Sequence, residues 1–164
     1  MKHGNEMRVP KIYLETSALN FVFTVQAPER RADTLKLFEE IRNGKYVPFT
    51  SEYVKEEIDK ASTNKMNELY ELIAEYNINS LQKTDDITRL AEEYVKEGII
   101  PEKHKMDAFH IATATVNGLD MIISWNFAHI VKRKTIRMTG QVNSRKGYKR
   151  IEICSPTEVI EHDV

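Results

Sequence analysis

Acidic side chains stand at several points of the chain where a strand or a helix is expected to begin or end. Glu15 closes the apolar run that starts at Lys11, and Asp107 stands where the apolar stripe of KMDAFHIATA begins. Carboxylates that meet from separate segments repel one another, and a hard divalent cation such as Mg²⁺ or Mn²⁺ relieves that repulsion. Because no histidine or cysteine belongs to the expected set, the pattern favours these ions over zinc. Such an ion can lower the pKa of an attacking water and neutralise charge on a phosphodiester.

Each of these acids also has an ordinary structural interpretation. Asp107 would interact favourably with the positive end of a helix, and Glu15 could be a polar residue in a turn. The segment SEYVKEEIDKA carries Glu56 and Glu57 side by side, and Glu57 could pair with Lys60 on a solvated helix face. Neighbouring residues of a helix point about 100° apart, so only one of the two glutamates can face a shared crevice. The apolar residues that follow Asp107 make it the strongest single candidate.

Short apolar runs alternate with amphipathic segments along the whole chain. The expected strands span residues 11–16, 45–49, 78–81, 121–124 and 150–153. The expected helices span residues 28–43, 51–61, 64–76, 85–98 and 101–117, with a last helix from residue 155. This alternation predicts an α/β fold, a three-layer α/β/α sandwich with a mainly parallel central sheet of about five strands. Ligands of such sheets bind outside the carboxyl ends of the strands, where the acids are expected.

Two local features qualify this assignment of elements. Pro48 within the second run suggests that this strand ends early or lies at an edge of the sheet. In the segment 28–43, Leu35, Phe38 and Ile41 recur at helical spacing, and Gly44 is a plausible end of the helix.

Length and composition indicate a globular protein. The chain has 164 residues, 41% of them hydrophobic and 30% charged, which suits a single domain at 11–164 after a flexible lead-in at 1–10. The single cysteine, Cys154, excludes a framework of intramolecular disulfides. No apolar run approaches the roughly 20 residues of a membrane span, and MKHGNEMRVP lacks the apolar core of a secretory signal. These features favour a cytoplasmic protein without a membrane partner.

The charge is distributed unevenly. The segment 132–150 contains eight Lys or Arg residues and no Asp or Glu, while the other residues carry 16 basic and 25 acidic side chains. This segment is either a solvated loop or a contact surface for a phosphate backbone, since clustered positive charge displaces condensed counterions. The residues expected to contact nucleic acid are Lys132, Arg133, Lys134, Arg137, Arg145 and Lys146.

Four motifs occur in an order that resembles the PIN-domain family, in its bacterial and archaeal VapC-like branch. They are YLETSALN, SEYVKEEI, KMDAFHIATA and ISWNFAHI, and the resemblance covers roughly residues 11–160. It implies a PIN fold and a Mg²⁺- or Mn²⁺-dependent endoribonuclease that hydrolyses RNA phosphodiester bonds. A more specific form of the same function is the toxin of a VapBC-type toxin–antitoxin pair, with an antitoxin protein as partner and a homodimer as assembly.

The resemblance also assigns site residues. It makes Glu15, Glu57 and Asp107 the metal ligands, Asn126 the fourth catalytic position and Ser17 a hydroxyl residue that supports the first acid. The family usually has aspartate where this chain has Glu15, and often where it has Asn126. The first change adds a methylene and the second removes a charge. An alternative is therefore a PIN-fold module that binds RNA or protein with weak or lost catalysis.

The remaining aromatic and histidine residues are expected to be structural. His110 follows Asp107 by three residues and is expected to pack at the core edge rather than act as a general base. Trp125 is expected in the core rather than stacked on a base, and His104 and His129 are expected at the surface. A third hypothesis is an interaction protein whose main role is oligomerisation, with the helix at 64–76 as a docking surface.

Overall fold

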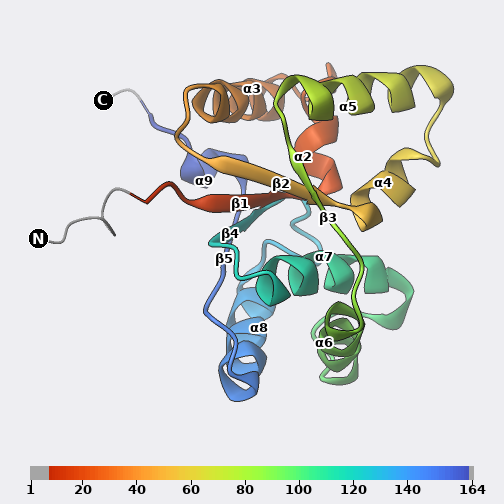
Figure 1. Cartoon of the computed structure of the whole chain (residues 1–164), viewed down its shortest axis with the longest axis vertical. Coiled ribbons are helices and arrows are strands. Elements are labelled where there is room, and N and C mark those ends of the chain that lie inside the picture. The colour runs from red at the N-terminus through yellow and green to blue at the C-terminus, as the bar shows by residue number, and fades with distance from the viewer. Residues whose placement is uncertain (1–7, 163–164) are drawn as a thin grey trace, which may run out of the picture.

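The computed structural model describes residues 8–162, so most of the predicted lead-in at 1–10 lies outside the described residues. The strands are β1 (Lys11–Leu14), β2 (Val47–Ser51), β3 (Asn79–Leu81), β4 (Met121–Ile123) and β5 (Glu152–Cys154). They form one sheet in the order β3-β2-β1-β4-β5, and every neighbouring pair is parallel (Figure 1). All carboxyl ends therefore lie at one edge of the sheet.

Helices cover both faces of this sheet (Figure 1). They are α2 (Thr16–Asn20), α3 (Pro28–Arg42), α4 (Glu52–Ile58), α5 (Thr63–Glu75), α6 (Asp85–Lys96), α7 (Lys105–Val116), α8 (Arg133–Lys146) and α9 (Pro156–Val159), with a 3₁₀ turn, η1 (Glu102–His104). Helices α2, α3 and α5 lie on one side of the sheet and α6, α7 and α8 on the other. The three-layer α/β/α sandwich predicted from the sequence is confirmed.

Side-chain caps explain where several helices begin. Ser51 and Thr84 accept hydrogen bonds from the backbone N–H groups three residues on, which starts α4 and α6. Ser155 and Glu158 form a reciprocal capping box at the start of α9. Each such cap satisfies an amide that the helix itself leaves unpaired and contributes about 1 kcal/mol. Among residues 8–162, no helix is long and apolar enough to cross a membrane.

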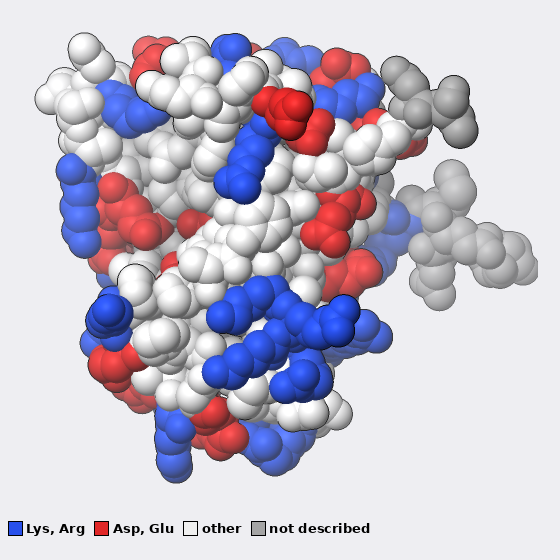
Figure 2. Space-filling model, turned by 180° about the vertical axis from the view of Figure 1, so that it is seen from behind, with Lys and Arg blue, Asp and Glu red and all other residues white. Residues whose placement is uncertain are grey.

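The basic segment 132–150 is mostly helix α8, so the expectation of a loop was wrong. The reason lies in the residues that α8 buries, which are mainly polar and give no apolar stripe: Thr135, Thr139, Val142 and Asn143. Asn143 accepts a hydrogen bond from the hydroxyl of Tyr94, which ties α8 to α6. Figure 2 shows Lys and Arg side chains gathered over the face of the molecule that α8 forms.

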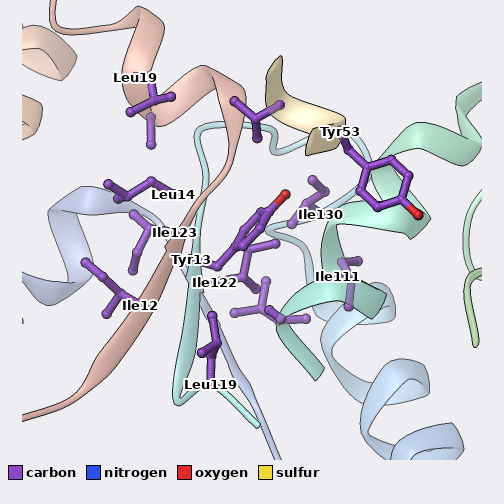
Figure 3. Close-up of a cluster of buried hydrophobic side chains, with 14 of the residues drawn as sticks. Ile12, Tyr13, Leu14, Leu19, Tyr53, Ile111, Leu119, Ile122, Ile123 and Ile130 are labelled. Atoms are coloured by element: carbon purple, nitrogen blue, oxygen red, sulfur yellow. The ribbon is translucent and has the colours of Figure 1, made fainter. Parts of the chain in front are cut away.

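The buried side chains of β1 alternate between the two faces of the sheet (Figure 3). Ile12 points to one face together with Ile123, while Tyr13 points to the other face with Ile122 and Ile111. All five side chains are completely buried. Helices on both faces therefore require central strands that are apolar throughout, which is why KIYL and MII read as continuous apolar runs.

The expectation that the strand containing Pro48 ends early or lies at an edge was also wrong. Strand β2 lies between β1 and β3 and continues past Pro48, because β3 first pairs at Phe49. No residue of β3 pairs with Pro48, so its missing N–H leaves no gap in the pairing with that strand. The Pro48 carbonyl accepts a hydrogen bond from the Asn79 side chain at 3.1 Å. In α3, Leu35 is 40% exposed and Thr34 is buried in its place.

Trp125 occupies the core as predicted. Its side chain is 6% exposed, and its indole N–H donates to the hydroxyl of Thr34 at 2.9 Å. A buried indole needs such an acceptor, which explains why α3 buries a threonine rather than a leucine at this point.

Candidate metal centre

Four segments that are distant in the sequence meet at the carboxyl edge of the sheet, where β1 and β4 end. Residues 15–17 follow β1, residues 124–126 follow β4, and Glu57 and Asp107 come from α4 and the first turn of α7. The chain leaves β1 toward β2, whereas β4 lies on the other side of β1. This is the topological switch point at which doubly wound sheets bind their ligands.

Glu15 is held by two hydroxyl groups. It is 5% exposed, and its Oε1 accepts hydrogen bonds from Ser17 Oγ at 2.6 Å and Ser124 Oγ at 2.5 Å. The backbone N–H of Trp125 donates to Ser17 Oγ, and that of Asn126 donates to Ser124 Oγ. Each hydroxyl oxygen thus accepts a hydrogen bond from a backbone N–H, and each hydroxyl donates its own proton to Glu15. Ser17 therefore supports the first acid, and Ser124 is a second support that the sequence did not reveal.

Glu57 is held in a similar way by its own Oε1. This atom accepts a hydrogen bond from the hydroxyl of Thr16 and lies 2.7 Å from His110 Nε2. His110 is completely buried, and its Nδ1 lies 2.6 Å from the hydroxyl of Tyr13, which in turn contacts Ser51 Oγ. The prediction of a packed histidine is correct, but its link to Glu57 was missed.

Burial and hydrogen bonding act in opposite directions on this pair. Burial raises the pKa of Glu57. The hydrogen bond and charge of His110, together with the hydrogen bond of Thr16, lower this pKa by more than burial raises it, so the net pKa lies below its ordinary value. Burial likewise lowers the pKa of His110, while Glu57 and the charges of Glu15 and Asp107 raise it above its ordinary value. Both directions favour a carboxylate paired with an imidazolium.

The structure separates the two neighbouring glutamates of α4. Glu56 is exposed and forms an ion pair with Lys83, whose backbone N–H also donates to Glu52 at 2.9 Å. Glu57 points the other way, toward Thr16 and His110. Of the acids in this helix, only Glu57 thus belongs to the cluster at the carboxyl edge.

Asp107, in the first turn of α7, lies close enough to this cluster for the charge of Glu15 to act on it. Its pKa is raised, first by burial and then by the negative charge of Glu15, while the side chain of Asn126 and nearby histidines oppose this rise. Asn126 uses its Oδ1 to accept a hydrogen bond from the backbone of His129 at 2.9 Å, so its amide N–H₂ is the group left to face Asp107.

The donor atoms fall into two adjoining groups, each containing histidine. Those of Glu15, Glu57 and His110 lie within 4.8 Å of one another, and so do those of His104, Asp107 and His129. The expectation of a cluster without histidine was therefore wrong. His104, Asp107 and His110 follow one another at intervals of three residues around the start of α7, which places them on one side and was the available signal.

The three carboxylates Glu15, Glu57 and Asp107, called the acidic group below, have the chemistry that a hard divalent ion requires. Glu15 and Glu57 are each held through Oε1, and within residues 8–162 the Oε2 of each accepts no hydrogen bond. No Lys or Arg of this range forms an ion pair with Glu15, Glu57 or Asp107. Carboxylates withdrawn from water without a Lys or Arg partner are costly, and the only cationic partner of Glu57 within residues 8–162 is His110. Oxygen donors of this kind suit Mg²⁺ or Mn²⁺.

The basic side chains selected from the sequence differ in how they are paired. Arg145 lies 3.3 Å from Glu93 of α6 and 3.7 Å from Glu97, the residue that follows α6, and Lys146 lies 4.0 Å from Glu93. The other four form no ion pair with residues 8–162: Lys132, Arg133, Lys134 and Arg137. Of these six side chains, those without an ion pair within residues 8–162 therefore lie at the start and in the first half of α8, which begins shortly after the loop that carries Asn126.

Comparisons with known proteins inform the fold only. No protein-family model matches the chain, and no curated protein matches it either. Solved structures do match, among them a chain of VapBC2 from Rickettsia felis, crystallised bound to a DNA fragment from their promoter. The two chains share 12% identity and superpose with a TM-score of 0.54 over 88% of this chain and 98% of that one. At this identity the likeness establishes a shared architecture, and the fold of this chain is PIN-like.

Proposed function

We propose that the protein is a Mg²⁺- or Mn²⁺-dependent endoribonuclease of the PIN-domain family, which hydrolyses RNA phosphodiester bonds. One observation carries this proposal. Glu15, Glu57 and Asp107 come from three separate elements to the carboxyl edge of a parallel sheet, without a paired Lys or Arg among the described residues. The similarity to a VapBC2 chain supports the same function at the level of the fold.

The three carboxylates would hold the ion between them. When bound, such an ion lowers the pKa of a coordinated water and neutralises negative charge on the phosphodiester under attack. The chain itself orients the oxygen donors: Ser17 and Ser124 hold Glu15, and His110 holds Glu57. Groups that orient metal ligands in this way typically affect metal affinity or activity by about 10- to 100-fold.

The unpaired basic residues at the start of α8 would contact the RNA backbone. Lys132, Arg133, Lys134 and Arg137 are exposed and lie a few residues beyond Asn126 in the chain. Contacts to phosphate position a nucleic acid without reading its sequence, and they make binding sensitive to salt. We therefore expect these residues to contribute affinity rather than the choice of cleavage site.

Cleavage of a mixed RNA pool tests the enzyme directly. We expect hydrolysis with Mn²⁺ or Mg²⁺, none with excess chelator, and a loss of at least about 100-fold in Asp107→Asn. Asp120→Asn is the matched control, because it removes the same charge at the opposite edge of the sheet. Cleavage by Asp107→Asn at the wild-type rate would overturn the proposal.

The more specific form of the function is a cytoplasmic toxin of a VapBC-type pair, which acts as a homodimer and is silenced by an antitoxin protein. Expression of the wild type is then expected to arrest growth, and Asp107→Asn is expected to be harmless at equal protein level. Co-expression of an antitoxin from a neighbouring gene should restore growth. Harmless wild-type expression alongside active cleavage in vitro would separate the nuclease from the toxin.

One observation favours a second candidate, a PIN-fold module that binds RNA or protein with little catalysis. The Oδ1 of Asn126 is engaged by the backbone of His129, so the fourth position of the family's site offers neither a charge nor a free carbonyl. In that case the chain would retain RNA in a filter-binding assay with Mn²⁺ but leave it intact over hours. Measurable turnover in the same mixture would exclude this candidate.

A further inference from the structure

A cluster of two histidines and one aspartate lies beside the acidic group. The ligand atoms of His104, Asp107 and His129 all lie within 4.8 Å of one another. The two imidazole rings face each other with centroids 4.2 Å apart and planes tilted by 30°. All three residues are half-buried, so the cluster is open to solvent on one side.

The backbone holds this cluster in place from two directions. His104 immediately precedes α7 and Asp107 lies in its first turn, so a spacing of three residues puts both on one face. His129 lies in the turn between β4 and α8. Its N–H donates to Asn126 Oδ1 at 2.9 Å, and its carbonyl accepts from Thr135 Oγ1 at 2.7 Å.

Within the part of the chain that the structure describes, the two imidazoles have no hydrogen-bond partner that explains their position. Neither ring nitrogen of His104 or His129 forms a hydrogen bond within residues 8–162, whereas both ring nitrogens of His110 are engaged. Asp107 likewise has no ion pair with a Lys or Arg of that range. Two free imidazoles and a carboxylate that converge are a donor set for a metal ion of intermediate softness.

We propose that His104, Asp107 and His129 form a second metal site, which binds a transition-metal ion such as Zn²⁺, Co²⁺ or Ni²⁺. Imidazole nitrogen binds these ions at about 2.0–2.1 Å, so the three side chains need to approach one another by roughly 1 Å on binding. Two histidines and one carboxylate leave coordination positions for water. The carboxylate also offsets the positive end of α7, which would otherwise disfavour a cation.

This site is chemically distinct from the acidic group, although both contain Asp107. Glu15 and Glu57 offer hard oxygen atoms, which suit Mg²⁺ or Mn²⁺, and the histidines select against those ions in favour of later transition metals. Binding of a transition metal does not depend on the proposed nuclease function. Only the effect of that binding on cleavage rests on the proposed function. An ion bound to the two histidines would withdraw Asp107 from the acidic group and slow cleavage.

Titration of the untagged protein with Co²⁺ in excess Mg²⁺ tests the site, with the visible absorption of bound Co²⁺ as the readout. We expect one site in the wild type and a loss of affinity of at least about tenfold in both His104→Asn and His129→Asn. His162→Asn is the matched control, since this exposed histidine lies near the C-terminal end of the described chain and, within residues 8–162, its ring forms a hydrogen bond only with the Thr157 carbonyl. Glu15→Gln should retain the Co²⁺ site.

Equal Co²⁺ affinity in the wild type and in both histidine variants would overturn the proposal. Fluorescence of Trp125 and thermal unfolding report whether each variant is folded, and both histidines are half-exposed, so their replacement leaves the core intact. Failure of the nuclease assay would not change the Co²⁺ titration. The two proposals therefore fail independently.

Discussion

The two edges of the parallel sheet both carry carboxylates, but among residues 8–162 only the carboxylate at the amino edge is paired with Lys and Arg. Asp120 stands just before β4 and accepts two hydrogen bonds from Arg8, at 2.8 and 3.1 Å. It also accepts from Lys149 Nζ at 2.8 Å and from the backbone N–H of Lys11 at 2.7 Å. These groups hold the pKa of Asp120 well below its usual range. The carboxylate thereby joins the first residue of β1 to the start of β4.

The carboxyl edge treats its acids in the opposite way. Glu15, Glu57 and Asp107 have hydroxyls, an amide and a buried histidine around them but no paired Lys or Arg within residues 8–162. Burial and the charge of Glu15 raise the pKa of Asp107. Asp120 at the amino edge therefore stabilises the fold, whereas at the carboxyl edge Glu57 has only His110 as a cationic partner and Glu15 and Asp107 form no ion pair within residues 8–162. Such uncompensated charge in a protein marks a functional site.

The largest expected effect comes from shortening the buried acid of the carboxyl edge, in Glu15→Asp. The hydroxyls of Ser17 and Ser124 are positioned for a carboxylate on two methylenes, and aspartate cannot reach both. A displacement of about 1 Å at a reacting centre can cost about 100-fold in rate, so we expect RNA cleavage to fall by 10- to 100-fold. Initial rates at saturating Mn²⁺ measure this.

The same substitution distinguishes an adapted site from a damaged one. A large gain in cleavage by Glu15→Asp would mean that the hydroxyl pair does not fit the glutamate and that aspartate is the better ligand. Ser124→Ala serves as the companion variant, because it removes one hydroxyl and keeps the glutamate. We expect a smaller loss for it than for Glu15→Asp.

At the amino edge the corresponding change, Asp120→Asn, should affect stability instead of activity. Because the pKa of Asp120 is depressed in the folded state, its contribution is present above the unfolded pKa of roughly 3.9 and disappears as pH falls through the lower folded pKa. We expect the free energy of unfolding at pH 7 to fall by about 1–2 kcal/mol, and less in high salt. Urea unfolding at pH 7 and pH 3 measures this, and an equal difference at both would contradict it.

The fold could be predicted because its signals are local. The apolar runs of β1 and β4 and the caps at Ser51 and Ser155 each lie within a few residues of the element that they define. Helix α8 was missed because its buried side is polar, and its fit depends on Asn143 meeting Tyr94 from another helix. Such a contact joins residues 49 positions apart and leaves no trace in local periodicity.

The site was predictable only as far as topology determines it. A residue at the end of a parallel strand must lie at the carboxyl edge, so Glu15 and the loop around Asn126 could be placed from the sequence. The pairing of His110 with Glu57, and of His104 with His129, depends on how α7 packs against α4 and on the turn after β4. The roles of these residues stay predictions until activity and metal binding are measured.

A smaller effect is expected from the ion pair that the carboxyl edge does contain. The raised pKa of His110 contributes stability that is complete below the unfolded pKa of about 6.5 and is lost as pH rises through the higher folded pKa. The lowered pKa of Glu57 contributes stability above about 4.3, which is lost as pH falls through the lower folded pKa. The ion pair between Glu57 and His110 therefore stabilises the protein most at pH values between the two unfolded pKa values, about 4.3 and about 6.5.

Glu57→Gln should remove this pH-dependent contribution to the free energy of unfolding. We expect the variant to be less stable than the wild type by about 1 kcal/mol near pH 6, with a difference that shrinks as the pH rises through the raised pKa of His110. Urea unfolding of both proteins between pH 5 and 9, without divalent ions, measures the difference. Two stability curves that run parallel across this range would show that His110 is not protonated in the folded wild type.

The smallest effect distinguishes the two halves of α8. Arg137 forms no ion pair with residues 8–162, so it is free to meet a phosphate, whereas Arg145 is engaged by Glu93 and Glu97. We expect Arg137→Gln to weaken RNA binding a few-fold at moderate salt and to reduce the slope of log K against log salt by about 1. Arg145→Gln, the matched control, should leave that slope unchanged and lower stability by less than about 1 kcal/mol, because its ion pairs are exposed. Equal slopes for both variants would mean that α8 does not contact the RNA backbone through Arg137.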